Sequence, residues 1–127
     1  QIMSTHTIIG AEALDTVLQY CDFEAFHLAR RIILYHHERY DGTGYPHRIK
    51  GEDIPIEARI MSLADIYDAL LSKRVYKPPF GYPEATERIA NEAGKHFDPI
   101  MTEIMMANIG RFEKIHQKYQ EEEAPSW

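Results

Sequence analysis

The segment from residue 36 to residue 46, HHERYDGTGYP, contains the residue types in this chain that most directly suggest chemistry. Its adjacent histidines, His36 and His37, precede a glycine-containing loop that ends in Tyr45 and Pro46. Imidazole is the side chain that most often binds metals in proteins, and glycine lets the backbone approach a ligand closely. We therefore predict a metal centre beside a loop that accepts an anion.

The adjacency of the two histidines constrains how such a centre is built. Side chains at successive helical positions point about 100° apart, so two mid-helix imidazoles do not easily serve a single ion. At a helix end, each can instead bind one ion of a two-metal site, in which the ions lie about 3.5–4 Å apart. The alternative interpretation is that one histidine is buried for structural reasons and the other is solvated.

Two further pairs of charged residues follow on the next expected helix. Asp65 and Asp68 are three residues apart, so we expect their carboxylates to share one face. The flanking sequence LADIYDALL is apolar, and a carboxylate there needs a partner such as a metal ion to offset its desolvation. Arg74 and Lys77 suit phosphate binding. The structural alternatives are two solvated acids, and two cations placed favourably at a helix C-terminus.

Hydrophobic periodicity predicts helices throughout the chain, and about five of them position these residues. We expect Ser4 and Thr5 to cap the first helix and Asp22 to cap the second. His37 is expected on the core-facing side of the second helix, at the start of a long loop that extends to Asp53. Loops of that length in compact domains are usually functional or mobile.

The second half of the chain is expected to add three helices. The third starts at residues 53–55, with its proline in the first turn, and stops before residue 78. The fourth covers residues 83–94 and the fifth runs from residue 98 to residue 119, with His96 supporting the turn between them. We expect one partial domain over residues 1–120 and a disordered acidic tail over residues 121–127.

A series of motifs in order along the chain resembles one known family. His6 precedes IIGAEAL; HHE, DGTGYP, ARI and ADIYDAL follow, and Arg74 and Lys77 come last. This series resembles the HD-GYP domain, a branch of the HD phosphohydrolases, over residues 3 to about 105. The resemblance implies an all-α helical bundle, the C-terminal part of an HD-GYP fold.

For function, the resemblance implies hydrolysis of cyclic di-GMP to pGpG, and to GMP after a second cleavage. It implies two or three divalent metal ions, usually iron or manganese, with His6, His36, His37 and Asp65 as ligands. The implied substrate-binding residues are Asp68, Arg74, Lys77, Gly44, Tyr45 and Pro46, and Asp68 and Lys77 are also expected to act in catalysis.

The chain departs from the family in one respect. The His-Asp dipeptide for which the family is named occurs nowhere in this sequence. The four candidate ligands are roughly half of what a cluster of two or three ions needs. We therefore expect this chain to be the C-terminal portion of a longer bacterial signalling protein, with the other ligands and a sensory or receiver domain upstream, and to be inactive by itself.

Composition limits the classes of function. The chain has 127 residues, 44% of them hydrophobic, which is typical of one packed domain. Its net charge of −6 argues against nonspecific binding to nucleic acid or to an anionic membrane. Its single cysteine, Cys21, cannot form an internal disulfide, as expected in the cytoplasm. No apolar run approaches the roughly 20 residues that span a bilayer.

Two alternatives to the cyclic di-GMP hydrolase stay open. The first is a noncatalytic module that senses a cyclic dinucleotide, or docks onto a diguanylate cyclase domain through the loop at residues 41–46. The second is a hydrolase of another cyclic dinucleotide, because groups that bind phosphate do not read the base.

Overall fold

The computed structural model describes residues 2–19, 23–73 and 78–123. All regular secondary structure within these ranges is helical, which confirms the all-α prediction. None of the described helices is sufficiently long and apolar to cross a membrane. Six α-helices and one 3₁₀ turn follow in chain order: α1 (Ile2–Leu18), α2 (Glu24–Tyr35), η1 (Gly51–Asp53), α3 (Ile56–Leu71), α4 (Tyr82–Asn91), α5 (Pro99–Ala107) and α6 (Ile109–Glu123).

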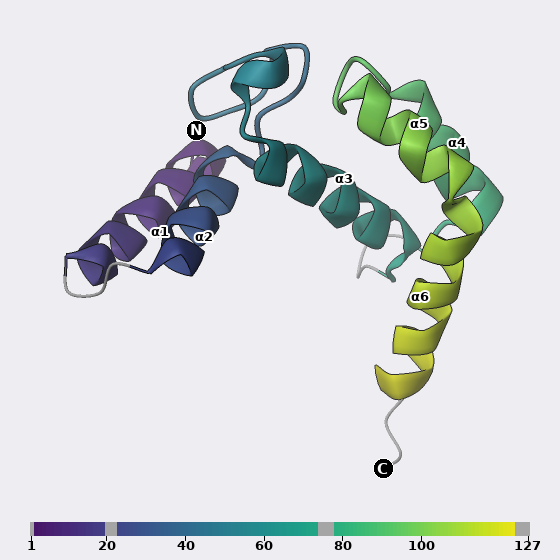
Figure 1. Ribbon diagram of the computed structural model, residues 1–127. Coiled ribbons are helices and arrows are strands. Elements are labelled where there is room, and N and C mark those ends of the chain that lie inside the picture. The colour runs from purple at the N-terminus through teal and green to yellow at the C-terminus, as the bar shows by residue number, and fades with distance from the viewer. Residues whose placement is uncertain (1, 20–22, 74–77, 124–127) are drawn as a thin grey trace.

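The helices are arranged as an arch (Figure 1). A hairpin of α1 and α2 forms one end, α3 runs through the middle, and α4, α5 and α6 form the other end. Each helix packs mainly against its neighbours in chain order. The loop between α2 and α3, which contains η1, lies over the N-terminal end of α3.

The α1–α2 hairpin depends on a close approach between the two helices. A methyl group added at Gly10 of α1 would overlap the side chain of Ile33 on α2. Arg30 Nε of α2 donates to the carboxylate of Asp15 on α1 across 2.6 Å, and both side chains are partly exposed. The absence of a side chain at position 10 therefore lets α2, which ends in the histidine pair, pack directly on α1.

The main hydrophobic core lies where α3 meets α4 and α5. Its buried side chains come from these helices and the turn between α4 and α5: Leu63, Tyr67, Leu71, Ala85, Ile89, Phe97 and Met105. An ion pair of 2.7 Å between Arg59 and Asp98, both largely buried, joins the start of α3 to the start of α5. Arg59 also donates to the carbonyl oxygen of Ile54, which fastens the end of the preceding loop.

The predicted ends of the first helices differ from the observed ones. Because α1 begins at Ile2, Ser4 and Thr5 lie within the helix and do not cap it. Phe23 occupies the N-cap of α2, and the predicted cap Asp22 lies outside the described residues. Pro55 is the N-cap of α3, one position before the first turn, and α3 ends at Leu71.

The predicted fifth helix is divided into α5 and α6. α5 begins where it was predicted, and Asp98 caps it, since its carboxylate accepts hydrogen bonds from the backbone N–H groups of Ile100 and Met101. At Asn108 the helix stops, and the side-chain amide donates to the carbonyl oxygen of Ile104. A polar side chain that satisfies a terminal carbonyl in this way competes with helix propagation.

Two other predicted boundaries also change. α4 ends at Asn91, before the predicted end at Gly94, which instead adopts a positive φ of 79° in the turn that leads to α5. α6 continues through Glu123, three residues into the segment that was expected to be disordered.

Candidate functional site

The side chain of Glu38 holds the loop that follows the histidine pair by hydrogen bonds. This side chain is only 2% exposed. Its carboxylate accepts hydrogen bonds from the backbone N–H groups of His47, at 2.7 Å, and Ile49, at 3.2 Å. Because a buried carboxylate needs partners, these two bonds explain why an acid follows the histidines. No role for Glu38 was predicted from the sequence, and only its place in HHE could have indicated one.

Backbone contacts fix the same loop from two other sides. The N–H groups of Tyr40 and Asp41 donate to the carbonyl oxygens of His96 and Lys95, which lie in the turn between α4 and α5. Gly44 is buried, and a methyl group there would overlap the backbone of residues 37–39. Glycine is therefore required at this position for the loop to fold back over the end of α2.

The histidine pair lines a cavity of about 270 Å³ between this loop and α3. His36 and His37 come from the end of α2, Gly44 and Tyr45 from the loop, and Asp65 from α3. Arg39, Thr43, Ser62, Ile66 and His96 also contribute to the wall. Three of the four predicted metal ligands thus face one cavity, although they are separated in the sequence by the whole α2–α3 loop.

Hydrogen bonding fixes which nitrogen of His36 is free. Its Nδ1 lies 2.7 Å from the carbonyl oxygen of Ile32 and 3.2 Å from that of Ile33. A carbonyl oxygen can only accept, so Nδ1 carries the proton and Nε2 keeps its lone pair. A backbone carbonyl that orients a histidine ring in this way is typical of imidazoles that bind metals.

His37 is half-buried and stacks on Tyr45, with ring centroids 5.0 Å apart and an angle of 19° between the planes. Burial lowers the pKa of His37, the neighbouring His36 lowers it further, and the carboxylate of Asp65 acts in the opposite direction. Metals bind the neutral imidazole, so this environment favours the form of His37 that can act as a ligand.

The other predicted site residues lie in different places. His6 is exposed on α1 and does not line the cavity, but its charge contributes to the lowered pKa of His37. Asp68 lines a different cavity from Asp65, because three helical positions still separate two side chains by about 60° around the axis. Arg74 and Lys77 lie outside the described residues.

The residues that face the cavity can be compared with the needs of a metal ion. Two imidazoles and one carboxylate form a donor set that suits divalent first-row metals. Within the part of the chain that the structure describes, however, no three His, Cys, Asp or Glu side chains converge closely enough to hold an ion together. The chemistry of the donors fits a metal ion, and their side chains would have to close around it.

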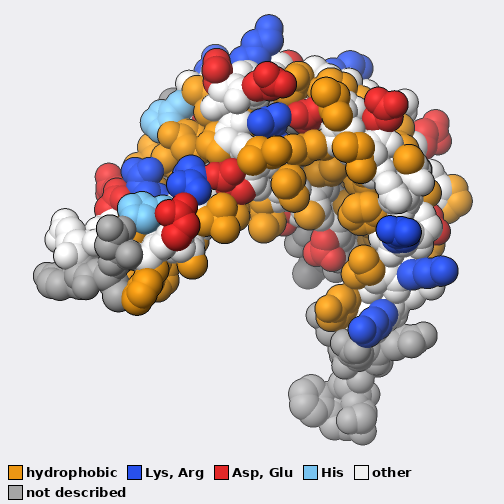
Figure 2. Space-filling model, in the orientation of Figure 1, with side chains coloured by type: hydrophobic (Ala, Val, Ile, Leu, Met, Phe, Trp, Pro, Cys, Tyr) orange, Lys and Arg blue, Asp and Glu red, His pale blue; other side chains and the backbone are white. Residues whose placement is uncertain are grey.

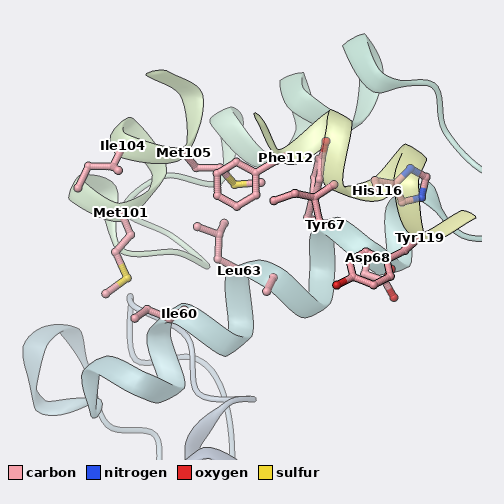
Figure 3. A pocket seen from close by; sticks show the side chains of 12 residues that line it. Ile60, Leu63, Tyr67, Asp68, Met101, Ile104, Met105, Phe112, His116 and Tyr119 are labelled. Atoms are coloured by element: carbon pink, nitrogen blue, oxygen red, sulfur yellow. The ribbon is translucent and has the colours of Figure 1, made fainter. Parts of the chain in front are cut away.

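A second, larger cavity lies on the inner side of the arch, where hydrophobic side chains gather (Figure 2). It measures about 510 Å³ and lies between α3, α5 and α6. Ile60, Leu63, Met101 and Phe112 point into it, and Asp68 lies near its α6 end (Figure 3). This groove is apolar and contains none of the predicted metal ligands.

Comparisons with known proteins agree with the fold and with the motifs. A profile of the HD domain family matches residues 3–101. A cyclic di-GMP phosphodiesterase of Vibrio cholerae is 44% identical over 115 residues, which are 90% of this chain and 23% of that protein. A 3'3'-cGAMP-specific phosphodiesterase of the same organism is 37% identical over 87% of this chain and 20% of its own length.

A solved structure shows the same relationship at the level of the fold. The crystal structure of a cyclic GMP-AMP specific phosphodiesterase from Vibrio cholerae superimposes with a TM-score of 0.65 and 26% sequence identity, over 84% of this chain and 23% of that chain. The chain therefore spans about a quarter of the length of the relatives it matches. The family match covers most of the chain and confirms the resemblance found in the motifs: the chain belongs to the HD domain family, in its HD-GYP branch.

Proposed function

We propose that this chain carries part of the active site of a metal-dependent phosphodiesterase that hydrolyses cyclic di-GMP to pGpG and GMP. The observation that carries the proposal is that the adjacent His36 and His37 line one polar cavity together with Asp65, which lies far from them in the sequence. The activities for which the Vibrio cholerae relatives are named support the reaction class. They also include a cyclic GMP-AMP enzyme, so the base specificity is a separate question.

The residues of the cavity divide into ligands and supports. When bound, a divalent metal ion lowers the pKa of water and neutralises charge on a phosphate. His36 offers Nε2 because Nδ1–H is held by the carbonyl of Ile32, and Asp65 offers a carboxylate from α3. Tyr45 holds the ring of His37 in position by stacking. His6 is the fourth proposed ligand.

The roles proposed for the remaining residues follow from the family resemblance. Gly44, Tyr45 and Pro46 belong to the loop beside the cavity and are proposed to contact substrate, and Arg74 and Lys77 are proposed to bind its phosphates. From its spacing to Asp65, Asp68 is proposed to orient a water molecule or to pass a proton to the leaving ribose oxygen, although it lines the apolar groove. Iron and manganese are the proposed metals, and the loop at residues 41–46 is a proposed contact for a diguanylate cyclase domain.

The test is hydrolysis of cyclic di-GMP by the natural protein that contains this chain, with Mn²⁺ under reducing conditions and products separated by chromatography. We expect Asp65→Asn, which keeps the size of an exposed side chain, to abolish hydrolysis and to weaken Mn²⁺ binding about ten-fold or more. Glu103→Gln changes an exposed carboxylate of α5 that does not line the cavity and should leave both unchanged. Equal activity in the wild type, Asp65→Asn and Glu103→Gln would refute the proposal.

A second candidate function is a noncatalytic module that binds a cyclic dinucleotide. The lack of three converging ligands among the described residues favours it. The same experiment separates the two candidates, because a sensing module would bind metal and dinucleotide and leave the dinucleotide intact.

A further inference from the structure

Two side chains in the wall of the histidine cavity contain buried polar atoms that have no hydrogen-bond partner. They are the hydroxyl oxygen of Ser62, on α3, and Nε of Arg39, in the loop. Ser62 as a whole is only 5% exposed. Buried polar groups are nearly always hydrogen-bonded, because leaving one unpaired costs free energy. Two such atoms in one wall indicate a ligand that supplies acceptors.

The hydroxyl of Ser62 differs from those of three side chains in or at the end of these helices, although the hydroxyls of Tyr67 and Thr86 are also buried without a partner. Thr16, Ser72 and Thr102 each donate to the carbonyl oxygen four residues earlier, at 3.2, 2.7 and 2.9 Å respectively. This back-bonding is the usual way in which a helical hydroxyl is satisfied. Ser62 makes no such bond, so its hydroxyl is available to a group in the cavity.

The terminal nitrogens of the Arg39 guanidinium hold the side chain in place by their contacts. Its Nη2 donates to the carboxylate of Glu92 at 3.3 Å, and its Nη1 lies 3.2 Å from Nδ1 of His96. Nε also forms an ion pair with the carboxylate of Asp41, but the distance of 3.7 Å is beyond hydrogen-bond distance. The guanidinium is therefore oriented by the C-cap of α4 and the following turn, while its Nε–H makes no hydrogen bond.

The chemistry of the two donors selects the class of ligand. A guanidinium with a free N–H, beside a free hydroxyl, matches the oxygens of a phosphate group. The imidazoles of His36 and His37 line the same cavity. We propose that Ser62 and Arg39 bind the non-bridging oxygens of the phosphodiester that is cleaved and position it against the histidine pair. This inference rests on the proposed function and assigns two substrate-positioning residues to it.

A first experiment measures binding and stability in parallel. Inorganic phosphate is titrated into the chain by calorimetry without added metal, and the Tm of each variant is recorded. Ser62→Ala should weaken phosphate binding about ten-fold, as expected for a hydrogen bond to a charged group. It should at the same time leave the Tm equal or higher, because it removes an unpaired buried hydroxyl. Unchanged phosphate affinity in Ser62→Ala would overturn the inference.

Matched controls separate binding from structural effects. Ser72→Ala removes a hydroxyl that is already bonded to the carbonyl of Asp68 and should leave phosphate affinity unchanged. Arg39→Gln should weaken binding more than Ser62→Ala does, because it also removes the positive charge. Arg88→Gln changes an arginine that lies over the ring of Phe80 outside this cavity and should have no effect. Equal losses in Arg39→Gln and Arg88→Gln would contradict the assignment.

A second experiment distinguishes failure of this inference from failure of the proposed function. In the natural protein that contains this chain, we expect Ser62→Ala to raise the KM for cyclic di-GMP about ten-fold with a smaller change in kcat. Hydrolysis with an unaltered KM would overturn the inference and leave the proposed function standing. Phosphate binding that depends on Ser62 and Arg39, in a protein that hydrolyses no dinucleotide, would support the phosphate site and refute the proposed function.

Discussion

At the scale of single residues, the site depends on which histidine nitrogens are free and which are protonated. The carbonyl oxygen of Ile32 accepts a hydrogen bond from Nδ1–H of His36 and so fixes the tautomer of that ring. The tautomer of His96 is fixed by a different partner. Its Nδ1 lies next to a guanidinium nitrogen of Arg39 and must accept a hydrogen bond from it. Burial lowers the pKa of His96, and the charge of Arg39 lowers it further. Protonation of His96 would end its hydrogen bond and place two cations together.

This arrangement predicts a loss of stability in acid. The pKa of His96 is lower in the folded state than its ordinary value of 6.5, so below about pH 6.5 the unfolded state binds more protons. The free energy of unfolding should therefore fall as the pH drops from 6.5 toward the folded pKa. Urea unfolding at pH 7.5, 6.5 and 5.5 measures this slope, and His96→Gln should make it shallower. His47→Gln, which changes an exposed ring, is the control; the same slope in wild type and His96→Gln would contradict the assignment.

Residue types and spacing identified part of the site from sequence. The adjacent imidazoles of His36 and His37, and the carboxylate of Asp65 in an apolar stretch, stand out because their chemistry is unusual for their surroundings. Ser62 and Arg39 could not be found in this way. A serine in a helix and an arginine in a loop are ordinary, and only the tertiary structure shows that their polar atoms are buried and unpaired.

At the scale of elements, the loop between α2 and α3 forms one wall of the histidine cavity and is held by one carboxylate. Glu38 accepts from two backbone N–H groups of the loop, and Gly44 lets the loop pass against the end of α2. The positions of Tyr45 and of the cavity wall follow from these contacts. The loop could be predicted from its glycines, but a carboxylate that bonds to the backbone nine and eleven residues away has no local sequence signature.

Glu38→Gln tests this attachment. An amide can accept from one of the two N–H groups, but its own NH₂ group would face the other, so one buried donor is left unpaired. We expect a loss of roughly 1–3 kcal/mol in the free energy of unfolding, with faster hydrogen exchange at the amides of His47 and Ile49. Glu52→Gln, an exposed acid in η1, should change neither quantity. Protection that is equal in both variants would show that Glu38 does not hold the loop.

At the scale of the whole molecule, the arch consists of helices that pack in chain order. Few contacts join distant segments, and the buried ion pair of Arg59 and Asp98 is one of them. The sequence predicted the helical fold from periodicity. It did not predict the division of the last helix at Asn108, because apolar positions continue at helical spacing from Met105 through Ile109 to Phe112. The division instead reflects a side-chain bond to the helix end.

Asp98→Asn tests how much the ion pair between α3 and α5 stabilises the fold. Asparagine can still cap α5, but Arg59 would lose the partner of its buried charge. Removal of one member of a buried pair costs about 3–5 kcal/mol in the free energy of unfolding. Asp15→Asn, which breaks the partly exposed pair with Arg30, should cost less than about 1 kcal/mol. Urea unfolding of both variants gives the comparison, and similar losses would contradict the role given to Asp98.

The position at which a metal ion binds this chain shows whether the histidine cavity is a metal site. Mn²⁺ is paramagnetic and broadens the NMR signals of nearby protons, so substoichiometric Mn²⁺ can be added while the histidine ring protons are observed. We expect the signals of His36 and His37 to broaden first, Asp65→Asn to reduce this effect, and His116, in the apolar groove, to be unaffected. Equal broadening of all histidines, or selective broadening away from the cavity, would show that the histidine cavity is not the metal site.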